Sequence, residues 1–351
     1  MPFAPRGLVL LLAGFCCFAA DDGDLLSRVR EHMRDYLGRL PDYTCRVTIE
    51  RSVRRSARTA YELTDRLRLE IAYANSREYY AWPGDDRFEN GIEELLPQRG
   101  LVSEGSWALH ARKLFLTNDA EFGPPRMADC GGTDCVQVDF LVPAVRSGFA
   151  VSAAGASAPA ALRGSVWFAR EGLDIVRLEV RVTDTPQSVR IASTREVTTY
   201  TRTRIGDVDF VLPATSELVL RDRDGSERMN RSRFDQYHRY AGSATVRYGA
   251  GESTEATAAA TASPPVRQGR VRAGTRVVAT LDAGIPADAA VGDLFTAGRV
   301  TGRITDLRRA GDRWSVELML LRVGADRAHG SVRKVLALPV PAGAVFTWRA
   351  E

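Results

Sequence analysis

The chain has 351 residues, about twice the length of a typical single domain, so two folded units are the starting expectation. Hydrophobic residues make up 44% and charged residues 26%, which excludes a chain that is disordered throughout. Of 48 basic residues only Lys113 and Lys334 are lysines, so arginine carries almost all the positive charge. The few cysteines and histidines form no dense cluster, which argues against a metalloprotein and against a small disulfide-rich scaffold.

Residues 1–20 are typical of a secretory signal peptide. Arg6 precedes an apolar run over residues 7–20 that is too short to span a membrane, and cleavage after Ala19 fits the small-residue rule. An uncleaved anchor is the alternative. Phe15 before Cys16 disfavours a lipoprotein signal. We therefore expect an exported protein with at most peripheral membrane association.

Export leaves three cysteines, Cys45, Cys130 and Cys135, in a compartment that permits disulfides. The turn-rich residues 131–134 separate the last two, and a hairpin there would bring the two sulfurs together. We expect a Cys130–Cys135 disulfide and a buried, inert Cys45 thiol. Pairing of Cys45 with either of the other two is left open.

Small and polar residues over 249–265, ending in a Pro-Pro pair, predict a flexible linker. It separates an amino-terminal unit, residues 21–248, from a carboxy-terminal unit, residues 266–351. A second stretch rich in small residues, 150–161, is predicted to be a long loop.

Apolar residues at spacings of three and four predict a helix over 25–40, ended by Pro41. A second amphipathic helix is predicted over 105–118. Alternating apolar and polar residues predict antiparallel strands joined by tight turns; these segments are 43–50, 63–71, 164–169, 175–182, 189–204, 210–220 and 228–240. The fold class is mainly β, a strongly curved antiparallel sheet or half-barrel whose apolar face the 105–118 helix covers.

The predicted layout includes the segments GSVWFAREGLDIVRLEVRV, residues 164–182, and IGDVDFVLP, residues 205–213. With these segments it resembles the half-open β-barrel of periplasmic outer-membrane lipoprotein carriers and of the amino-terminal domain of a periplasmic sensor of mislocalised lipoproteins. LPDYTC and FDQYHRY also resemble segments of exported acidobacterial proteins. The resemblance implies a periplasmic or outer-membrane-associated protein.

The carboxy-terminal unit is predicted to be a small basic β-barrel or sandwich. Its strands are expected over 271–282, 298–307 and 314–323, with turns at Gly284 and Gly292. It resembles β-modules appended to other exported bacterial proteins.

Signatures of catalysis are missing from the sequence. It has no G-x-S-x-G turn, no phosphate-binding glycine loop and no H-E-x-x-H pair, and the four histidines are scattered. We expect no enzymatic activity, no cofactor and no metal site.

A cavity between the curved sheet and its covering helix would bind a hydrophobic or lipidated envelope molecule. The residues expected to line it are Tyr80, Trp82, Trp107, Leu114 and Phe115. The alternative is that these side chains simply pack a core. In that case the protein is a structural or scaffolding envelope protein with a self-filled barrel.

Arginines of the carboxy-terminal unit suggest a second kind of contact, because guanidinium groups bind phosphate and carboxylate groups. The residues expected to dock on an anionic cell-wall polymer or on lipopolysaccharide are Arg303, Arg308, Arg309 and Arg313. A solvated surface without a partner is the alternative. Nucleic acid is not expected as a partner of an exported protein.

Overall fold

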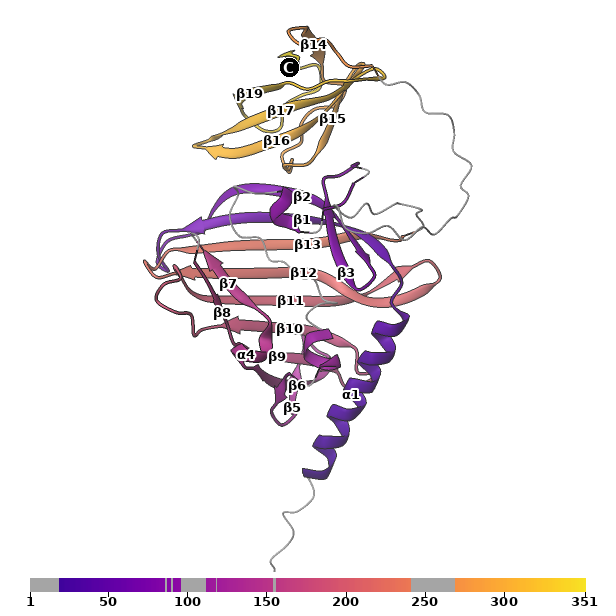
Figure 1. Ribbon diagram of the computed structural model, residues 1–351, viewed down its shortest axis with the longest axis vertical. Coiled ribbons are helices and arrows are strands. Elements are labelled where there is room, and N and C mark those ends of the chain that lie inside the picture. Colours follow the sequence, from indigo (N-terminus) through magenta and orange to yellow (C-terminus); the bar gives the residue numbers. More distant parts are fainter. Residues whose placement is uncertain are drawn as a thin grey trace, which may run out of the picture.

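The computed structural model describes residues 19–85, 87–89, 91–95, 112–117, 119–153, 156–240 and 269–351 (Figure 1). The predicted signal peptide up to residue 18 and the predicted linker 249–265 lie outside these ranges. Within them, no helix is both long and apolar enough to cross a membrane.

A strongly curved antiparallel sheet forms the amino-terminal unit, as predicted, and its main path runs β3-β2-β1-β13-β12-β11-β10-β9-β6-β4, with β5 added beside β6 (Figure 1). Its strands are β1 (Tyr43–Arg54), β2 (Glu62–Ala74), β3 (Arg77–Ala81), β4 (Glu121–Phe122), β5 (Arg126–Asp129), β6 (Asp134–Val142), β9 (Leu162–Ala169), β10 (Ile175–Val182), β11 (Ile191–Ile205), β12 (Val208–Asp222) and β13 (Glu227–Arg239). The predicted strands of this unit all lie in this sheet.

Side-chain alternation gives the sheet two different faces. On β1, Val47 and Ile49 are buried, and their partners Leu69 and Leu67 on β2 are fully buried. We call the side that carries these residues the inner face. Thr48 and Glu50 point to the opposite side, the outer face.

Helix α1 (Ala19–Arg39) packs on the inner face, where Figure 1 shows it running beside the sheet. Val29 and Met33 are 1% exposed, and the Tyr36 hydroxyl donates a hydrogen bond of 2.8 Å to the carbonyl of Val211 in β12. The spacing of these residues places them on one stripe of the helix. The predicted opening helix is therefore present, with its apolar stripe on the sheet.

Short helical segments complete the cover of the inner face: α2 (Ile92–Leu95) and the π-helix η1 (Arg112–Leu116). A further short helix, α4 (Ala144–Ser147), follows β6. Of the helix predicted over 105–118, residues 105–111 lie outside the described ranges. The described part is a five-residue π-helix that contacts α1.

The predicted hairpin at the cysteines is confirmed. β5 pairs with β6, and Cys130 and Cys135 form a disulfide across the turn, with their Cα atoms 5.9 Å apart. Cys45 is a free, buried thiol on the inner face of β1. Its burial raises the pKa of the thiol far above the usual range, and the charge of Glu78 adds to the shift.

The prediction of a long loop over residues 150–161 is wrong in one respect. β7 (Ala150–Ala153) and β8 (Ala156–Pro159) pair as a two-stranded antiparallel sheet. These strands consist of alanine, serine, valine and proline, so they carry little of the hydrophobic alternation that marks strands in a sequence.

The carboxy-terminal unit, Gly269–Glu351, is a small β structure as predicted. β15 to β19 form one sheet and β14 pairs with β20. Its core includes Trp348, 1% exposed and stacked on Phe295 at 5.9 Å between ring centroids. The strands are β14 (Arg276–Thr280), β15 (Leu294–Ala297), β16 (Val300–Ala310), β17 (Arg313–Val323), β18 (Asp326–Arg327), β19 (Ser331–Leu336) and β20 (Val345–Arg349).

The two units meet along β2 (Figure 1). β3 pairs with only the second half of β2, which leaves backbone groups near Leu67 open. Val291 fills this edge: its nitrogen donates to the carbonyl of Arg66, and its carbonyl accepts from the nitrogen of Arg68, both at 2.8 Å. Backbone pairing therefore fastens the carboxy-terminal unit to the large sheet.

Candidate functional site

The inner face encloses a cavity of about 40 Å³ near the β3 edge of the sheet. One wall is apolar and comes from β1, β2, β3, α2, β12 and β13; its residues are Val47, Ile49, Ile71, Tyr80, Ile92, Leu218 and Phe234. The other wall is polar and comes from β11, β12 and β13; its residues are Glu196, Ser216, Asn230 and Ser232. We call these four residues the inner polar cluster.

Strand register brings the inner polar cluster together. Ser216 faces Ser232 across β12 and β13, and Leu218 faces both Glu196 and Asn230. Ser216 Oγ donates a 2.8 Å hydrogen bond to Glu196 Oε1, and Asn230 is 5% exposed. Burying polar groups costs free energy unless they are hydrogen-bonded, so such a cluster on a core-facing surface is unusual.

The sequence prediction missed the inner polar cluster. Its members lie inside long strands in which polar residues are common on both sides, and only the register shows that these four share the inner face. Polar residues at inward-facing strand positions could have indicated the cluster. Recognising them requires knowing which residues of each strand point inward.

Of the five predicted ligand-binding residues, Tyr80 lies at the cavity. It is 5% exposed, and its hydroxyl donates a 3.0 Å hydrogen bond to Glu78 Oε2. Trp82 lies elsewhere, because its ring sits against Gly292 of the carboxy-terminal unit. The prediction that Trp82 lines the cavity is therefore wrong, because its indole packs at the junction of the two units.

Leu114 and Phe115 lie over the far part of the inner face, and each is 2% exposed. The Phe115 ring is 5.7 Å from both Phe122 of β4 and Phe168 of β9, between centroids. The structure thus separates these two residues from Tyr80. Trp107, the remaining predicted residue, lies outside the described ranges.

The cavity is small for its predicted role. A volume of about 40 Å³ accommodates a few water molecules, whereas sites for drug-sized ligands measure roughly 300 to 1,000 Å³. Around this cavity, the inner face is filled mainly by the protein's own side chains. An acyl chain would enter only if part of the cover moved.

The four arginines predicted to dock on anionic polymers are not equivalent. Arg303 is 5% exposed and binds Asp85 of the amino-terminal unit, so it is unavailable to a polymer. Arg308, Arg309 and Arg313 lie around the hairpin between β16 and β17, and Arg308 Nε donates to Asp306 at 3.1 Å. The predicted docking set therefore reduces to these three residues.

Among the residues that the structure describes, no group of histidine, cysteine, aspartate or glutamate side chains is arranged to hold a metal ion.

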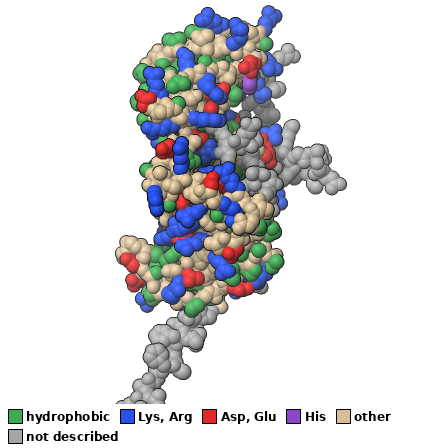
Figure 2. Space-filling model, turned by 90° about the vertical axis from the view of Figure 1, so that its left-hand side faces the viewer, with side chains coloured by type: hydrophobic (Ala, Val, Ile, Leu, Met, Phe, Trp, Pro, Cys, Tyr) green, Lys and Arg blue, Asp and Glu red, His purple; other side chains and the backbone are tan. Residues whose placement is uncertain are grey.

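On the face drawn in Figure 2, arginine and lysine side chains gather around the middle of the molecule. Positively charged side chains are thus a prominent feature of this part of the surface.

Comparison with known proteins gives partial structural similarities at low sequence identity. No family model matches the chain, and no curated protein matches it. A LolA superfamily protein from Nitrosomonas europaea is similar at 10% identity and a TM-score of 0.26, over 60% of this chain and 92% of that chain. A DUF1329 family protein from Desulfovibrio piger is similar at 11% identity and a TM-score of 0.31, over 63% of this chain and 94% of that one.

Proposed function

We propose that this protein is an exported, non-catalytic binding protein of the cell envelope, and that its large sheet holds a hydrophobic or lipidated ligand against the inner face. The observation that carries the proposal is the cavity, which is lined by apolar residues and by the inner polar cluster beside them. An amphipathic ligand matches both walls: its chain contacts Ile49 and Ile71, and its polar group reaches Glu196 and Ser232.

The free energy for such binding comes from the apolar chain, at roughly 0.8 kcal/mol for each buried methylene. The inner polar cluster would fix the orientation of the ligand, because hydrogen-bonding groups in an apolar site orient a ligand more than they add to its affinity. A ligand would therefore enter with its chain along the apolar wall and its polar end at Ser216.

The cover of the inner face is suited to movement. α2 is four residues long and η1 is a five-residue π-helix, so each has few backbone hydrogen bonds of its own. Displacing such a short segment costs less than displacing α1. We propose that the cavity enlarges by movement of α2, whose Ile92 lines it, when a ligand binds.

Two features support export. The sequence of residues 1–20 is typical of a signal peptide, and the Cys130–Cys135 disulfide fits an oxidising compartment. The periplasm supplies both this redox environment and lipidated molecules as ligands.

A titration with a fluorescent long-chain fatty alcohol tests the proposal, because its hydroxyl can hydrogen-bond to Glu196 without placing a second carboxylate there. Ser232→Leu fills the cavity from the inner face, and Ser193→Leu makes the same change on β11, in a groove of the outer face. We expect the wild-type protein to bind the probe, Ser232→Leu to weaken binding at least about tenfold, and Ser193→Leu to leave it unchanged. Equal binding by all three proteins would contradict the proposed site.

One observation favours a second candidate, a scaffolding protein whose barrel is filled by its own side chains. Leu114 and Phe115 are almost completely buried, and the cavity of about 40 Å³ has room for only a few water molecules. In that case the protein docks on anionic envelope polymers without taking up a ligand. Failure of the wild-type protein to bind any acyl probe would favour this candidate.

A further inference from the structure

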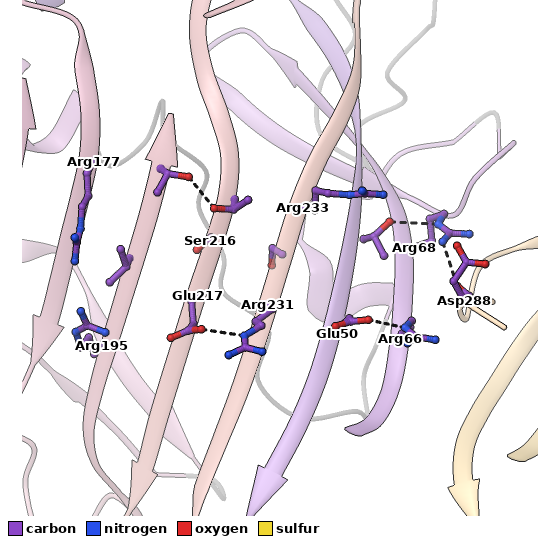
Figure 3. Close-up of a pocket in the computed structure, with 15 residues that line it drawn as sticks. Glu50, Arg66, Arg68, Arg177, Arg195, Ser216, Glu217, Arg231, Arg233 and Asp288 are labelled. Atoms are coloured by element: carbon purple, nitrogen blue, oxygen red, sulfur yellow. Dashed lines mark hydrogen bonds and ion pairs between the residues drawn. The ribbon is translucent and has the colours of Figure 1, made fainter. Parts of the chain in front are cut away.

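The outer face of the large sheet carries a groove of about 700 Å³ that crosses the strands from β2 to β10 (Figure 3). Its charged lining consists mainly of arginines: Arg66, Arg68, Arg177, Arg195, Arg231 and Arg233. The acidic lining residues are Glu50, Glu217 and Asp288. The arginines of the groove lie on the side of the sheet opposite the proposed hydrophobic site, although Ser216 and Ser232 line both the groove and the cavity.

Strand register sorts the outer-face residues into two rows that run across the sheet. We call the first the arginine–threonine row; in order from β2 to β10 it is Arg68, Thr48, Arg233, Thr215, Thr199 and Arg177. We call the second the arginine–glutamate row; in the same order it is Arg66, Glu50, Arg231, Glu217, Val197 and Glu179. The first row contains no carboxylate, whereas the second contains three.

In the arginine–glutamate row, arginines and glutamates on neighbouring strands pair and neutralise one another's charge. Arg66 Nε donates to Glu50 Oε1 at 2.7 Å, and Arg231 Nε donates to Glu217 Oε2 at 3.0 Å, as Figure 3 shows. Cross-strand pairs of opposite charge stabilise a sheet. This row therefore has a structural role.

The centre of the arginine–threonine row is different. Arg233 is 73% exposed, and its Nη2 lies 3.6 Å from Asp235, which is longer than a well-formed hydrogen bond. Thr48 and Thr215 flank it on the neighbouring strands. A guanidinium between two hydroxyl groups thus faces the groove.

Arg177, at the β10 end of the row, belongs to a cluster with excess positive charge. Arg177, Arg181 and Arg195 all bind the same carboxylate, Glu179, which is 5% exposed. The Arg177 guanidinium lies over the Trp167 ring, 4.7 Å from its centroid, and its Nε is buried without a hydrogen-bond partner. Burial raises the pKa of Glu179, but hydrogen bonds from Arg195 and Arg181 outweigh it, so the net pKa is lowered. One carboxylate therefore balances three cations.

At the β2 end, Arg68 is held in place from the carboxy-terminal unit. Its Nη1 donates to both carboxylate oxygens of Asp293, at 2.6 and 2.7 Å, and its Nε donates to Thr48 at 3.3 Å. These bonds fix the Arg68 side chain at the mouth of the groove. The junction of the two units thus shapes one end of the row.

We propose that the arginine–threonine row binds the phosphate groups of an extended polyanionic chain. Strands are about 4.8 Å apart, so Arg233 lies roughly 10 Å from Arg68 and 14 Å from Arg177 across the sheet. A single phosphate cannot span these separations, whereas a chain with several phosphates can. Thr48 and Thr215 flank Arg233 on the neighbouring strands, and their hydroxyls also contact Arg68 and Thr199. A phosphate group has more acceptor oxygens than a carboxylate, so at Arg233 it can bind the guanidinium and a flanking hydroxyl together.

The test compares two arginines of the same strand and face. Arg233→Ala removes a charge from the arginine–threonine row, and Arg231→Ala removes one from the arginine–glutamate row, two residues away. Both side chains are largely exposed, at 73% and 61%, so neither change should prevent folding. Binding of inorganic polyphosphate of defined length is measured for the full chain by titration calorimetry, with polyglutamate of similar charge and neutral dextran as comparisons.

We expect the wild-type protein to bind polyphosphate in a salt-dependent manner, more tightly than polyglutamate, and not to bind dextran. Arg233→Ala should weaken polyphosphate binding about tenfold, and Arg231→Ala by about twofold or less. Equal losses in the two variants would show unspecific attraction to the surface and overturn the proposal. Polyglutamate binding as tight as polyphosphate binding, or no binding at all, would also overturn it.

Discussion

Arg303 of β16 binds Asp85, which lies 218 residues earlier in the chain. Its two terminal nitrogens donate to the two carboxylate oxygens at 3.0 and 2.7 Å, and one of them also donates to the carbonyl of Pro83 at 3.0 Å. Because the Arg303 side chain is only 6% exposed, this ion pair is shielded from solvent on one side. It is one of the contacts that hold the carboxy-terminal unit on the large sheet.

Removing Asp85 should leave the buried Arg303 charge without its partner. We expect Asp85→Ala to lower the free energy of unfolding by about 2 kcal/mol, since an unpaired buried charge keeps its desolvation cost. Urea unfolding followed by tryptophan fluorescence measures the change. Arg204→Ala is the control, because Arg204 and its partner Asp209 are 69% and 50% exposed and the change should cost well under about 1 kcal/mol. Similar losses in the two variants would refute the argument.

Gly292 permits the close approach of the two units. Its φ is +103°, and a Cβ there would lie 2.3 Å from the carbonyl oxygen of Arg68 and 2.8 Å from the Trp82 ring. We expect Gly292→Ala to push the carboxy-terminal unit away from β2 and to destabilise its attachment. Trp82 fluorescence should then shift to longer wavelength as water reaches the ring. Gly298→Ala, at a positive φ with open space around it, should not cause that shift.

Stability should fall in acid through Glu227. Burial raises the pKa of this carboxyl, but hydrogen bonds from Tyr61, Arg221 and Arg54 outweigh it and lower the pKa to about 2. An unfolded glutamate titrates at about 4.3, so the contribution of Glu227 is complete above about pH 5 and is lost as the pH falls towards 2. Urea midpoints between pH 7 and pH 3 measure this loss. Glu227→Gln should be less stable at pH 7 and show a flatter pH profile; a profile parallel to the wild type would contradict the assignment.

The Cys45 thiol should be inert in the folded protein. It is 4% exposed and its pKa is raised by burial, so the reactive thiolate is scarce at pH 8. In protein produced without residues 1–20, we expect no reaction with Ellman's reagent in buffer and one thiol per chain in urea. Rapid reaction of the folded protein would show that Cys45 is accessible. Three thiols in urea would show that Cys130 and Cys135 are not bonded.

The strands and their faces could be predicted because a sheet with one buried face repeats every two residues. Val47 and Ile49 alternate with Thr48 and Glu50, and this pattern alone predicts both the strand and its core-facing side. The opening helix was predictable for the same reason at a period of 3.6. The Cys130–Cys135 disulfide followed from the turn between the two residues.

Contacts that depend on strand register or on distant segments could not be predicted. The sequence around Arg303 shows an arginine in a basic unit, and nothing nearby indicates that its partner is Asp85. The inner polar cluster and the arginine–threonine row each combine residues from three or more strands, so the relative register of all of them is needed. Trp82 was misplaced because an aromatic residue after a strand looks the same in a cavity as at a junction between units.

The central claim is that the inner face of the sheet takes up a hydrophobic or lipidated molecule. Native mass spectrometry of the protein purified from its own cell envelope, followed by lipid extraction, tests this most directly. The account predicts a bound species whose mass includes an acyl chain, and its loss in Ser232→Leu but not in Ser193→Leu. A wild-type protein that carries no acyl chain, and takes none up from added lipid, would contradict it.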